Sequence, residues 1–333
     1  MRFDLLMLFR VWIFAKLVLG LSLAHAQQQT GPQGWAGEDV AAEARKELGK
    51  DAPPELLIVG ADRADTADSY IALWHFAKRC NGGKHLTNVA QEVGDCVSWG
   101  TGNACEYSLA VQIVLGQADG KFREAYPPYI YGASRVQIGG GKIRGDGSVG
   151  AWAAKAIEQY GVLAQDEPGV PDYSGSIARD WGKHGPPPNF VTLAKPFTAE
   201  TRRITDWDDA CQSLANGWPI AVCSSAGFGK IVEANNRIEG RWSTSWAHCM
   251  CFVAMDTRAG REALYCLNSW GPNAHAAAKR YAELDGAPPG GFWVLKADAE
   301  KMLKQGDSHA VSFNGFKPRP KSVYETLQKP GAN

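Results

Sequence analysis

The chain has 333 residues, of which 45% are hydrophobic. That is enough for the core of one domain of about 200–250 residues with extensions, or of two small domains. Lys and Arg together number 35, as do Asp and Glu, so the formal charge is zero, which argues against nucleic acid or an anionic membrane surface as a partner.

The N-terminus has the pattern of an export signal. A charged start precedes an apolar stretch over residues 11–23, and Ala24-His25-Ala26 supplies small residues for cleavage. The apolar stretch is short for a membrane span, although an uncleaved anchor is the alternative interpretation. We therefore expect a signal peptide over residues 1–26 and a secreted or periplasmic protein, with no stable membrane insertion after cleavage.

A leader over residues 27–75 follows, and it is a candidate for a short inhibitory prosegment. Its Gln- and Gly-rich start, residues 27–37, is predicted to be disordered. Further along, the patterns predict helices over Asp39–Leu48 and Asp68–Arg79 and a strand over Leu56–Val59.

The stretch Gln-Glu-Val-Gly-Asp-Cys ends at Cys96 and precedes a run with apolar residues at mostly helical spacing up to Leu115. Cys96 is therefore predicted at a helix N-terminus, where free N–H groups and the helix dipole favour the nucleophilic thiolate. A free cysteine is more often a small buried hydrophobe, so this stretch alone leaves a structural role open. The adjacent Asp95 would raise the thiol pKa unless its carboxylate faces water.

The middle of the chain contains few candidate functional residues. The aromatic, proline-rich Tyr126–Tyr131 predicts an extended or turning segment, and the Pro- and Gly-rich residues 164–198 predict a loop. The glycines at 139–147 lack the P-loop ending and the dinucleotide-binding spacing, which argues against a phosphate site. A helix is predicted over Ala151–Tyr160 and a central strand over Pro219–Val222.

Two apolar runs, Ala247–Ala254 and Ala263–Leu267, are joined by a polar turn and predict a β-hairpin. The hairpin places His248 and Asn268 on adjacent antiparallel strands, which brings them side by side. A further strand is predicted over Gly291–Leu295.

Eight cysteines remain after the signal peptide, and an exported chain could form disulfides among them. Cys249 and Cys251 alternate along the first strand of the hairpin beside Phe252, so we expect buried thiols there. The chain has no pair of Cys-x-x-Cys motifs, and we expect no metal site.

The order of Cys96, His248 and then Asn268 within Asn-Ser-Trp-Gly resembles that of the papain-like cysteine peptidases, in a divergent bacterial-type branch. The resemblance implies an α+β fold of two lobes, one helical and one β-rich and barrel-like, with the active-site cleft between them. It covers a catalytic domain over residues 76–312, followed by a tail over 313–333.

The resemblance also implies roles for single residues. Cys96 would attack a carbonyl carbon, His248 would hold the proton, and Asn268 would orient the imidazole. Trp270 would cover the His–Asn bond, and the Gln91 side chain would complete the oxyanion hole with the Cys96 N–H. Four residues separate Gln91 from Cys96, where the family usually has five.

Gly147-Ser148, followed by a predicted helix, resembles the segment that carries a Gly-Gly pair in the family and binds the substrate backbone. Ser148 stands at the second position of that pair. Gly145 stands where the family usually has a half-cystine, so the corresponding disulfide is absent.

The resemblance therefore implies an exported cysteine-type peptidase that acts on a peptide or protein substrate, as a monomer, without a cofactor. One alternative is a catalytically silent papain-like module that binds peptides or partners. The other is a thiol amidase or acyltransferase that uses the same fold.

Overall fold

The computed structural model describes residues 31–118 and 120–318, so the signal peptide predicted for residues 1–26 and the end of the tail lie outside the described residues. The elements are, in chain order, α2 (Glu38–Leu48), η1 (Gly49–Asp51), η2 (Gly60–Asp62), β1 (Tyr70–Ala72), α3 (Trp74–Cys80), α4 (Cys96–Val114), α5 (Pro127–Gly132), η3 (Ala133–Ile138), α6 (Gly150–Gln159), α7 (Gly175–His184), α8 (Pro188–Ala194), β2 (Glu200–Ile204), α9 (Trp207–Ala215), β3 (Ile220–Gly227), β4 (Lys230–Ala234), β5 (Arg237–Arg241), β6 (Thr244–Asp256), β7 (Ala263–Leu267), α10 (Ala278–Glu283), β8 (Gly291–Leu295), α11 (Lys296–Lys304) and β9 (Asp307–Ser312).

The described strands form one sheet in the order β2-β9-β3-β6-β7-β8-β5-β4, with β1 on the end of β6. Its ladders are antiparallel except for β5 with β8. The 13-residue β6 pairs with β3, β7 and β1. The β6–β7 hairpin confirms the predicted one, and β8 has the bounds predicted from the sequence.

Helix α4 is the central helix of the described chain. It is buried on nearly all sides, as expected for a helix whose apolar residues do not keep to one face. At Gly100 an added Cβ would lie 2.8 Å from the Met250 carbonyl oxygen, so the α4 backbone lies directly against β6. Cys96 is the first residue of α4, which confirms the predicted helix N-terminus.

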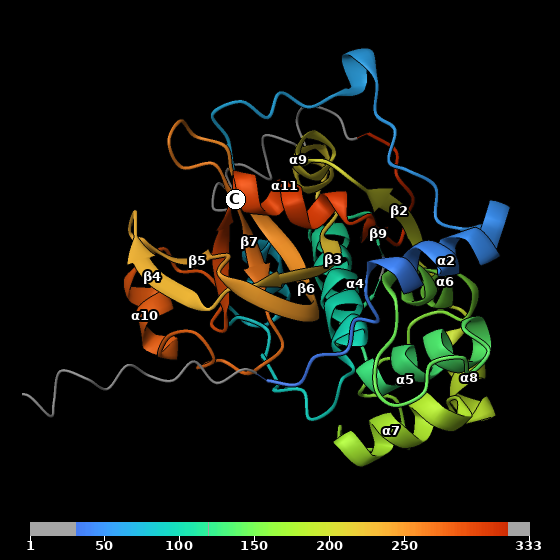
Figure 1. The fold of residues 1–333 in the computed structure, drawn as a ribbon. Coiled ribbons are helices and arrows are strands. Elements are labelled where there is room, and N and C mark those ends of the chain that lie inside the picture. Colours follow the sequence, from blue (N-terminus) through green and yellow to red (C-terminus); the bar gives the residue numbers. More distant parts are fainter. Residues whose placement is uncertain (1–30, 119, 319–333) are drawn as a thin grey trace, which may run out of the picture. The chain divides into compact units, whose positions relative to one another are not determined.

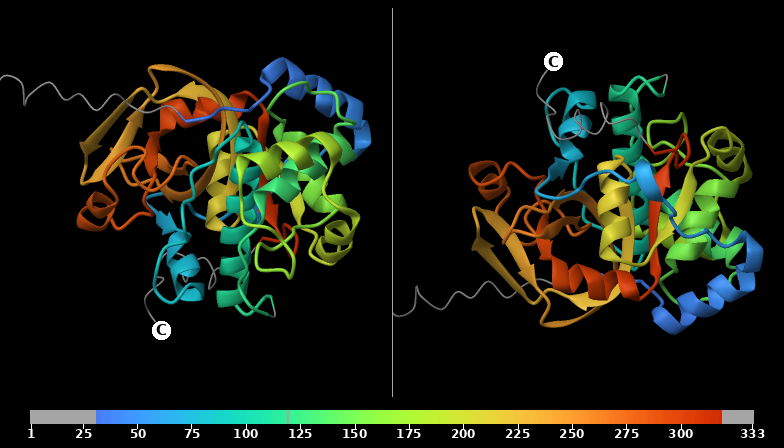
Figure 2. Two further views of the ribbon diagram at one scale, coloured as in Figure 1. Left: turned by 90° about the horizontal axis from the view of Figure 1, so that it is seen from below. Right: turned by 90° about the horizontal axis from the view of Figure 1, so that it is seen from above.

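Figure 1 shows α4 between the strands β3, β6 and β7 on one side and the helices α5 to α8 on the other, with β2 and β9 beside α6. Figure 2 gives two further views of this arrangement. Helices α9 and α11 contact β3, and α6 contacts β9. The α+β class with separate helical and sheet parts is confirmed. Within the described residues, none of the helices has both the length and the apolar character that a bilayer span requires.

Two proline-rich segments that were predicted as loops contain helices. Tyr126–Tyr131 enters α5, and residues 164–198 contain α7 and α8. Pro127 and Pro188 each occupy the start of a helix, where the missing N–H group costs no intrahelical bond. Ser174 caps α7 by accepting a hydrogen bond from the Ile177 N–H, 3.3 Å away. The loop predictions were wrong because proline and glycine were counted without their positions in the helix.

The leader also differs from its predictions. Helix α2 confirms the helix over Asp39–Leu48, but Leu56–Val59 forms no strand and only the adjacent Glu55 bridges to Arg203. Asp68–Arg79 begins with strand β1 before helix α3. Residues 31–36, predicted as part of a disordered start, have defined hydrogen bonds described below.

The eight cysteines are free thiols, and all except the half-buried Cys80 are buried. Cys249 and Cys251 are buried, as predicted. Cys249 lies opposite Cys223 on β3, with 2.8 Å between the two sulfur atoms.

Candidate active site

The Cys96 side chain is fully buried at the N-terminus of α4. Burial raises the pKa of the thiol well above its ordinary value, and nearby Asp95 raises it further. The backbones of Cys249 and Gly34 lower the pKa of the thiol, but burial outweighs them. The thiol is therefore neutral in this structure.

The Asp95 carboxyl group faces the protein interior and not water. It is fully buried, and its Oδ2 accepts a hydrogen bond from the Tyr173 hydroxyl group at 3.1 Å. Trp99 packs edge-on against the Tyr173 ring, with 5.0 Å between the centroids. Burial raises the pKa of Asp95 to about 7. This carboxyl group therefore titrates near neutral pH beside the candidate nucleophile.

His248 lies in β6 with Nε2 2.7 Å from Asn268 Oδ1. The Ser269 backbone N–H donates to the same oxygen at 2.7 Å, so this atom is an acceptor and His248 Nε2 carries the proton. The other ring nitrogen, Nδ1, is buried and has no hydrogen-bond partner among the described residues. An unprotonated nitrogen of this kind can accept the proton of a thiol.

A second histidine, His275, holds the other side of the Asn268 amide. Asn268 Nδ2 lies 2.9 Å from His275 Nε2 and donates to it. His275 packs edge-on against Phe292, with 4.8 Å between the ring centroids. Burial lowers the pKa of His275 to about 3, so the ring is a neutral acceptor. Sequence reasoning missed His275, because it lies in a loop outside the motif that marks Asn268.

Trp270 covers the bond between His248 and Asn268. Its ring lies over the imidazole with 4.7 Å between the centroids and 31° between the planes. The indole N–H donates to the Pro32 carbonyl oxygen at 3.1 Å. Burial lowers the pKa of His248 to about 4. Cys96 and His248 are thus both neutral here, and a thiolate–imidazolium pair is disfavoured in this closed arrangement.

Gln91 lies in the loop before Cys96 and its amide is occupied. Nε2 donates to the Val93 carbonyl oxygen at 2.8 Å, and Oε1 accepts from the Ser269 hydroxyl group at 2.6 Å. The Gln91 backbone N–H also donates to the Ser269 carbonyl oxygen. Gln91 therefore ties the Cys96 loop to the Asn268–Ser269 turn.

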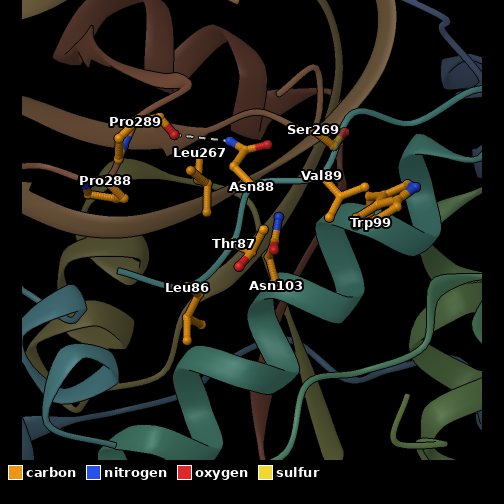
Figure 3. A pocket seen from close by; sticks show the side chains of 10 residues that line it. All are labelled: Leu86, Thr87, Asn88, Val89, Trp99, Asn103, Leu267, Ser269, Pro288 and Pro289. Carbon is orange, nitrogen blue, oxygen red and sulfur yellow. Dashed lines mark hydrogen bonds between the residues drawn. The ribbon is translucent and has the colours of Figure 1, made fainter. Parts of the chain in front are cut away.

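A small pocket lies between α4 and this turn (Figure 3). Asn88 spans it, donating to the carbonyl oxygens of Asn268 at 2.8 Å and Pro289 at 3.1 Å. The pocket is lined by Leu86, Thr87, Asn88, Val89, Trp99, Asn103, Leu267, Ser269, Pro288 and Pro289.

Residues 31–36, which we name the strap, run across these side chains as an extended segment. The Gly34 N–H donates to the carbonyl oxygen of Ala247, the residue before His248, at 3.0 Å. On the other side, the Ser148 N–H donates to the Gly34 carbonyl oxygen at 2.8 Å, and the Ala36 N–H donates to the Ser148 carbonyl oxygen at 2.9 Å. The strap therefore bridges the helical part and β6 as a peptide ligand would.

Gly34 is the point of closest approach between the strap and the Cys96 loop. A Cβ added at Gly34 would lie 1.8 Å from the Gly94 carbonyl oxygen. The Gly34 backbone also acts on the pKa of the Cys96 thiol, while the Gly34 carbonyl oxygen accepts the hydrogen bond from Ser148. The strap thus covers the thiol, and its carbonyl group at this point is engaged elsewhere.

No sequence profile of a protein family and no curated protein sequence matches the chain. Solved structures do match it. Xylellain, a cysteine protease from Xylella fastidiosa, superposes with a TM-score of 0.56 at 15% identity, covering 86% of this chain and 97% of xylellain. The ragweed cysteine protease Amb a 11, in its proform, gives 0.52 at 13% identity over 85% and 77% of the two chains. Digestive procathepsin L2 of Tenebrio molitor gives 0.51 at 13% identity over 87% and 81%.

The chain has the papain-like fold. At this level of identity the likeness establishes the fold, and the chemistry has to be argued from the residues of this chain.

In this papain-like chain, Gly147 and Ser148 lie beside the strap, and the buried Arg135 holds their loop. The Arg135 guanidinium donates to the Gly147 carbonyl oxygen, to that of Gly145 at 2.7 Å and to that of Ile143 at 3.1 Å. Sequence reasoning noted the missing half-cystine at Gly145 but missed Arg135. We infer that the guanidinium fixes the loop in place of a disulfide.

The same loop is tied directly to the loop of the candidate nucleophile. Asp146 Oδ2 accepts a hydrogen bond from the Gly94 N–H at 3.2 Å, and Arg179 lies 3.6 Å from Asp146 Oδ1. Among the described residues, no cluster of His, Cys, Asp and Glu has the arrangement of a metal site.

Proposed function

We propose that this chain is an exported cysteine-type peptidase that hydrolyses peptide bonds with Cys96, His248 and Asn268. The observation that carries the proposal is the bond from His248 to Asn268 at 2.7 Å beneath Trp270, with Nδ1 left free. Helix α4, which begins at Cys96, packs directly on the part of β6 that follows His248, since a Cβ added at Gly100 would lie 2.9 Å from the Cys249 sulfur. The strand that carries the imidazole therefore adjoins the helix that carries the thiol.

The chemistry would proceed in two halves. His248 Nδ1 takes the Cys96 proton, the sulfur attacks the peptide carbonyl carbon, and the imidazolium returns the proton to the leaving amine. Water then attacks the thioester, with the same nitrogen as base, and releases the acid. The Cys96 N–H, in the first turn of α4, has no intrahelical acceptor and can donate to the oxyanion. Such a donor contributes about 3–4 kcal/mol.

The proposal includes self-inhibition by the strap. Residues 31–36 occupy the place of a peptide between Ser148 and Ala247, and their removal would open Cys96 and His248 to water. Water would lower the pKa of the thiol and raise the pKa of the imidazole, because burial causes both present shifts. The ion pair that attacks substrate would then form.

The test is peptide hydrolysis by the full chain carrying Gly34→Ala, whose Cβ would collide with the Gly94 carbonyl oxygen at 1.8 Å and expel the strap. Gly102→Ala is the matched control, because its Cβ would lie an ordinary 3.5 Å from the Ala125 side chain. We expect Gly34→Ala to hydrolyse an unstructured protein at least about tenfold faster than the unsubstituted chain. Adding Cys96→Ala should abolish this hydrolysis, and its survival would refute the proposal.

A silent peptide-binding module is the second candidate, and the occupied Gln91 amide favours it. Its Nε2 donates to the Val93 carbonyl oxygen and would have to turn to serve an oxyanion. A folded Gly34→Ala variant that binds peptides but leaves them intact would establish this second candidate.

A further inference from the structure

The Trp35 side chain of the strap is buried beside Ser148, and we call the site that it fills the Trp35 pocket. Its flanking residues, Gly34 and Ala36, pair with the Ser148 backbone, and the Trp35 side chain is only 4% exposed. Its indole N–H donates to Asp307 Oδ2 at 2.8 Å. The strap therefore shows how the side chain of an extended peptide can be bound and recognised at this position.

Asp307, at the start of β9, forms the polar end of the pocket and is fully buried. Besides the indole, it accepts the Gly150 N–H at 2.7 Å and the Ala151 N–H at 2.9 Å, both in the first turn of α6. A Cβ at Gly150 would lie 2.6 Å from the Asp307 carbonyl oxygen, so glycine is needed for this close approach. The carboxyl group is thus fixed before any ligand arrives.

Arg45 of α2 balances the charge of this carboxylate. Its Nη1 lies 3.8 Å from Asp307 Oδ1, and this nitrogen is buried without a hydrogen-bond partner among the described residues. A ligand with its own positive charge would bring a second cation beside Arg45. A large apolar side chain with an uncharged N–H donor, such as that of tryptophan, can bind in the pocket without repulsion from Arg45.

We propose that this pocket selects tryptophan at one position of the peptide substrate, with Asp307 as the residue that determines the specificity. The inference rests on the proposed peptidase function. Phenylalanine would fill the pocket but leave the buried Asp307 Oδ2 one donor short, which is costly for a charged group. Arginine would supply hydrogen-bond donors, but its positive charge would be repelled by Arg45.

The test uses the full chain with Gly34→Ala and a set of quenched fluorescent peptides in which one position at a time is Trp, Phe, Arg or Leu. At one position we expect kcat/KM for Trp to exceed that for Phe and for Arg by about tenfold or more. Equal rates for Trp and Phe, or a preference for Arg or Leu, would overturn the inference.

Two variants test whether Asp307 and Arg45 determine the preference for tryptophan. Asp307→Asn keeps an acceptor for the α6 N–H groups and should bring the Trp-to-Phe ratio towards one. Arg45→Gln removes the competing cation and should shift the preference towards Arg. An unchanged Trp, Phe and Arg profile in both variants would contradict a role for this carboxylate.

A binding measurement separates this inference from the proposed function. The double variant Cys96→Ala, Gly34→Ala is titrated with the same peptides by calorimetry. Selective binding of the Trp peptide without hydrolysis in the Gly34→Ala variant would refute the peptidase and leave the inference standing. Hydrolysis without a preference for the Trp peptide would support the peptidase function and overturn the inference. A folded double variant that binds none of the peptides would overturn the inference.

Discussion

The charges of the Cys96 and His248 side chains are the property of the site that the strap affects. The Cys96 thiol and the His248 imidazole are both buried, and burial opposes charge on each of them. The Nε2 side of the His248 ring is nevertheless fixed, because Nε2 bonds to Asn268 and the Asn268 amide is in turn held by His275. The imidazole is therefore held in one orientation, while neither it nor the thiol carries a charge.

Asp95 gives a prediction about stability and pH. Its pKa is raised to about 7 in the folded chain, above the ordinary value of 3.8, so the folded state binds one proton more than the unfolded state between these values. The stability contributed by this group is present at low pH and is lost as the pH rises towards 7. The unsubstituted chain should lose on the order of a few kcal/mol relative to Asp95→Asn between pH 4 and 7.

Urea unfolding of both proteins at pH 4, 5.5, 7 and 8 measures this difference. Taking the difference between the two proteins removes the contributions of the other carboxyl groups. A constant difference across this range would mean that Asp95 is ionised in the folded chain throughout.

Asn268 gives a prediction about rate. Asn268→Ala removes the acceptor that holds the proton on His248 Nε2, so the ring would populate the wrong tautomer. In the Gly34→Ala background, kcat should fall, but by less than the loss on His248→Ala, since a positioned base contributes about 10²–10⁴-fold. Steady-state kinetics and circular dichroism test this, and equal losses accompanied by altered spectra would indicate a structural role instead.

Among the elements, the strap and the loop 143–147 were the least predictable from the sequence. A Gln- and Gly-rich composition predicts disorder, but Gly34 is required by its close approach to Gly94 and is not a sign of flexibility. The Trp35–Asp307 bond joins residues 272 positions apart, which no local pattern reveals. The role of Arg135 is equally hidden from the sequence, because most of its acceptors are backbone carbonyl oxygens, which have no sequence signature.

Strap release should change the titration of Cys96. In Gly34→Ala the rate of alkylation by iodoacetamide should rise, and its pH midpoint should fall relative to the unsubstituted chain, because water reaches the thiol. Gly102→Ala should follow the unsubstituted chain. Peptide mapping identifies Cys96 among the eight cysteines. Identical profiles for all three proteins would show that the strap does not control the thiol.

Arg135 should act on substrate binding through the loop that it holds. Arg135→Lys keeps a charge but cannot reach three carbonyl oxygens from one planar group. In the Gly34→Ala background KM should rise by about tenfold with a smaller change in kcat, because the loop positions the Ser148 backbone. Fluorogenic peptide kinetics measure this, and a fall in kcat alone would place the effect elsewhere.

For the chain in general, the sequence was most informative where chemistry and periodicity coincide. The hairpin of β6 and β7 and the N-terminus of α4 follow from apolar spacing, and they position His248, Asn268 and Cys96. The fold class follows from the order of these motifs and is confirmed by the structural matches. The helices α5, α7 and α8 and the strap depend on tertiary contacts and on the place of proline or glycine within an element, which composition does not report.

We propose that Cys96 and His248 form a working thiol site once the strap is displaced. The test is intact-mass analysis of the full chain carrying Gly34→Ala, after treatment with a thiol-directed epoxide peptide in mild reductant. We expect a single adduct that maps to Cys96 and is lost when His248→Ala is added. A folded Gly34→Ala protein with no adduct, or with an adduct that persists without His248, would contradict it.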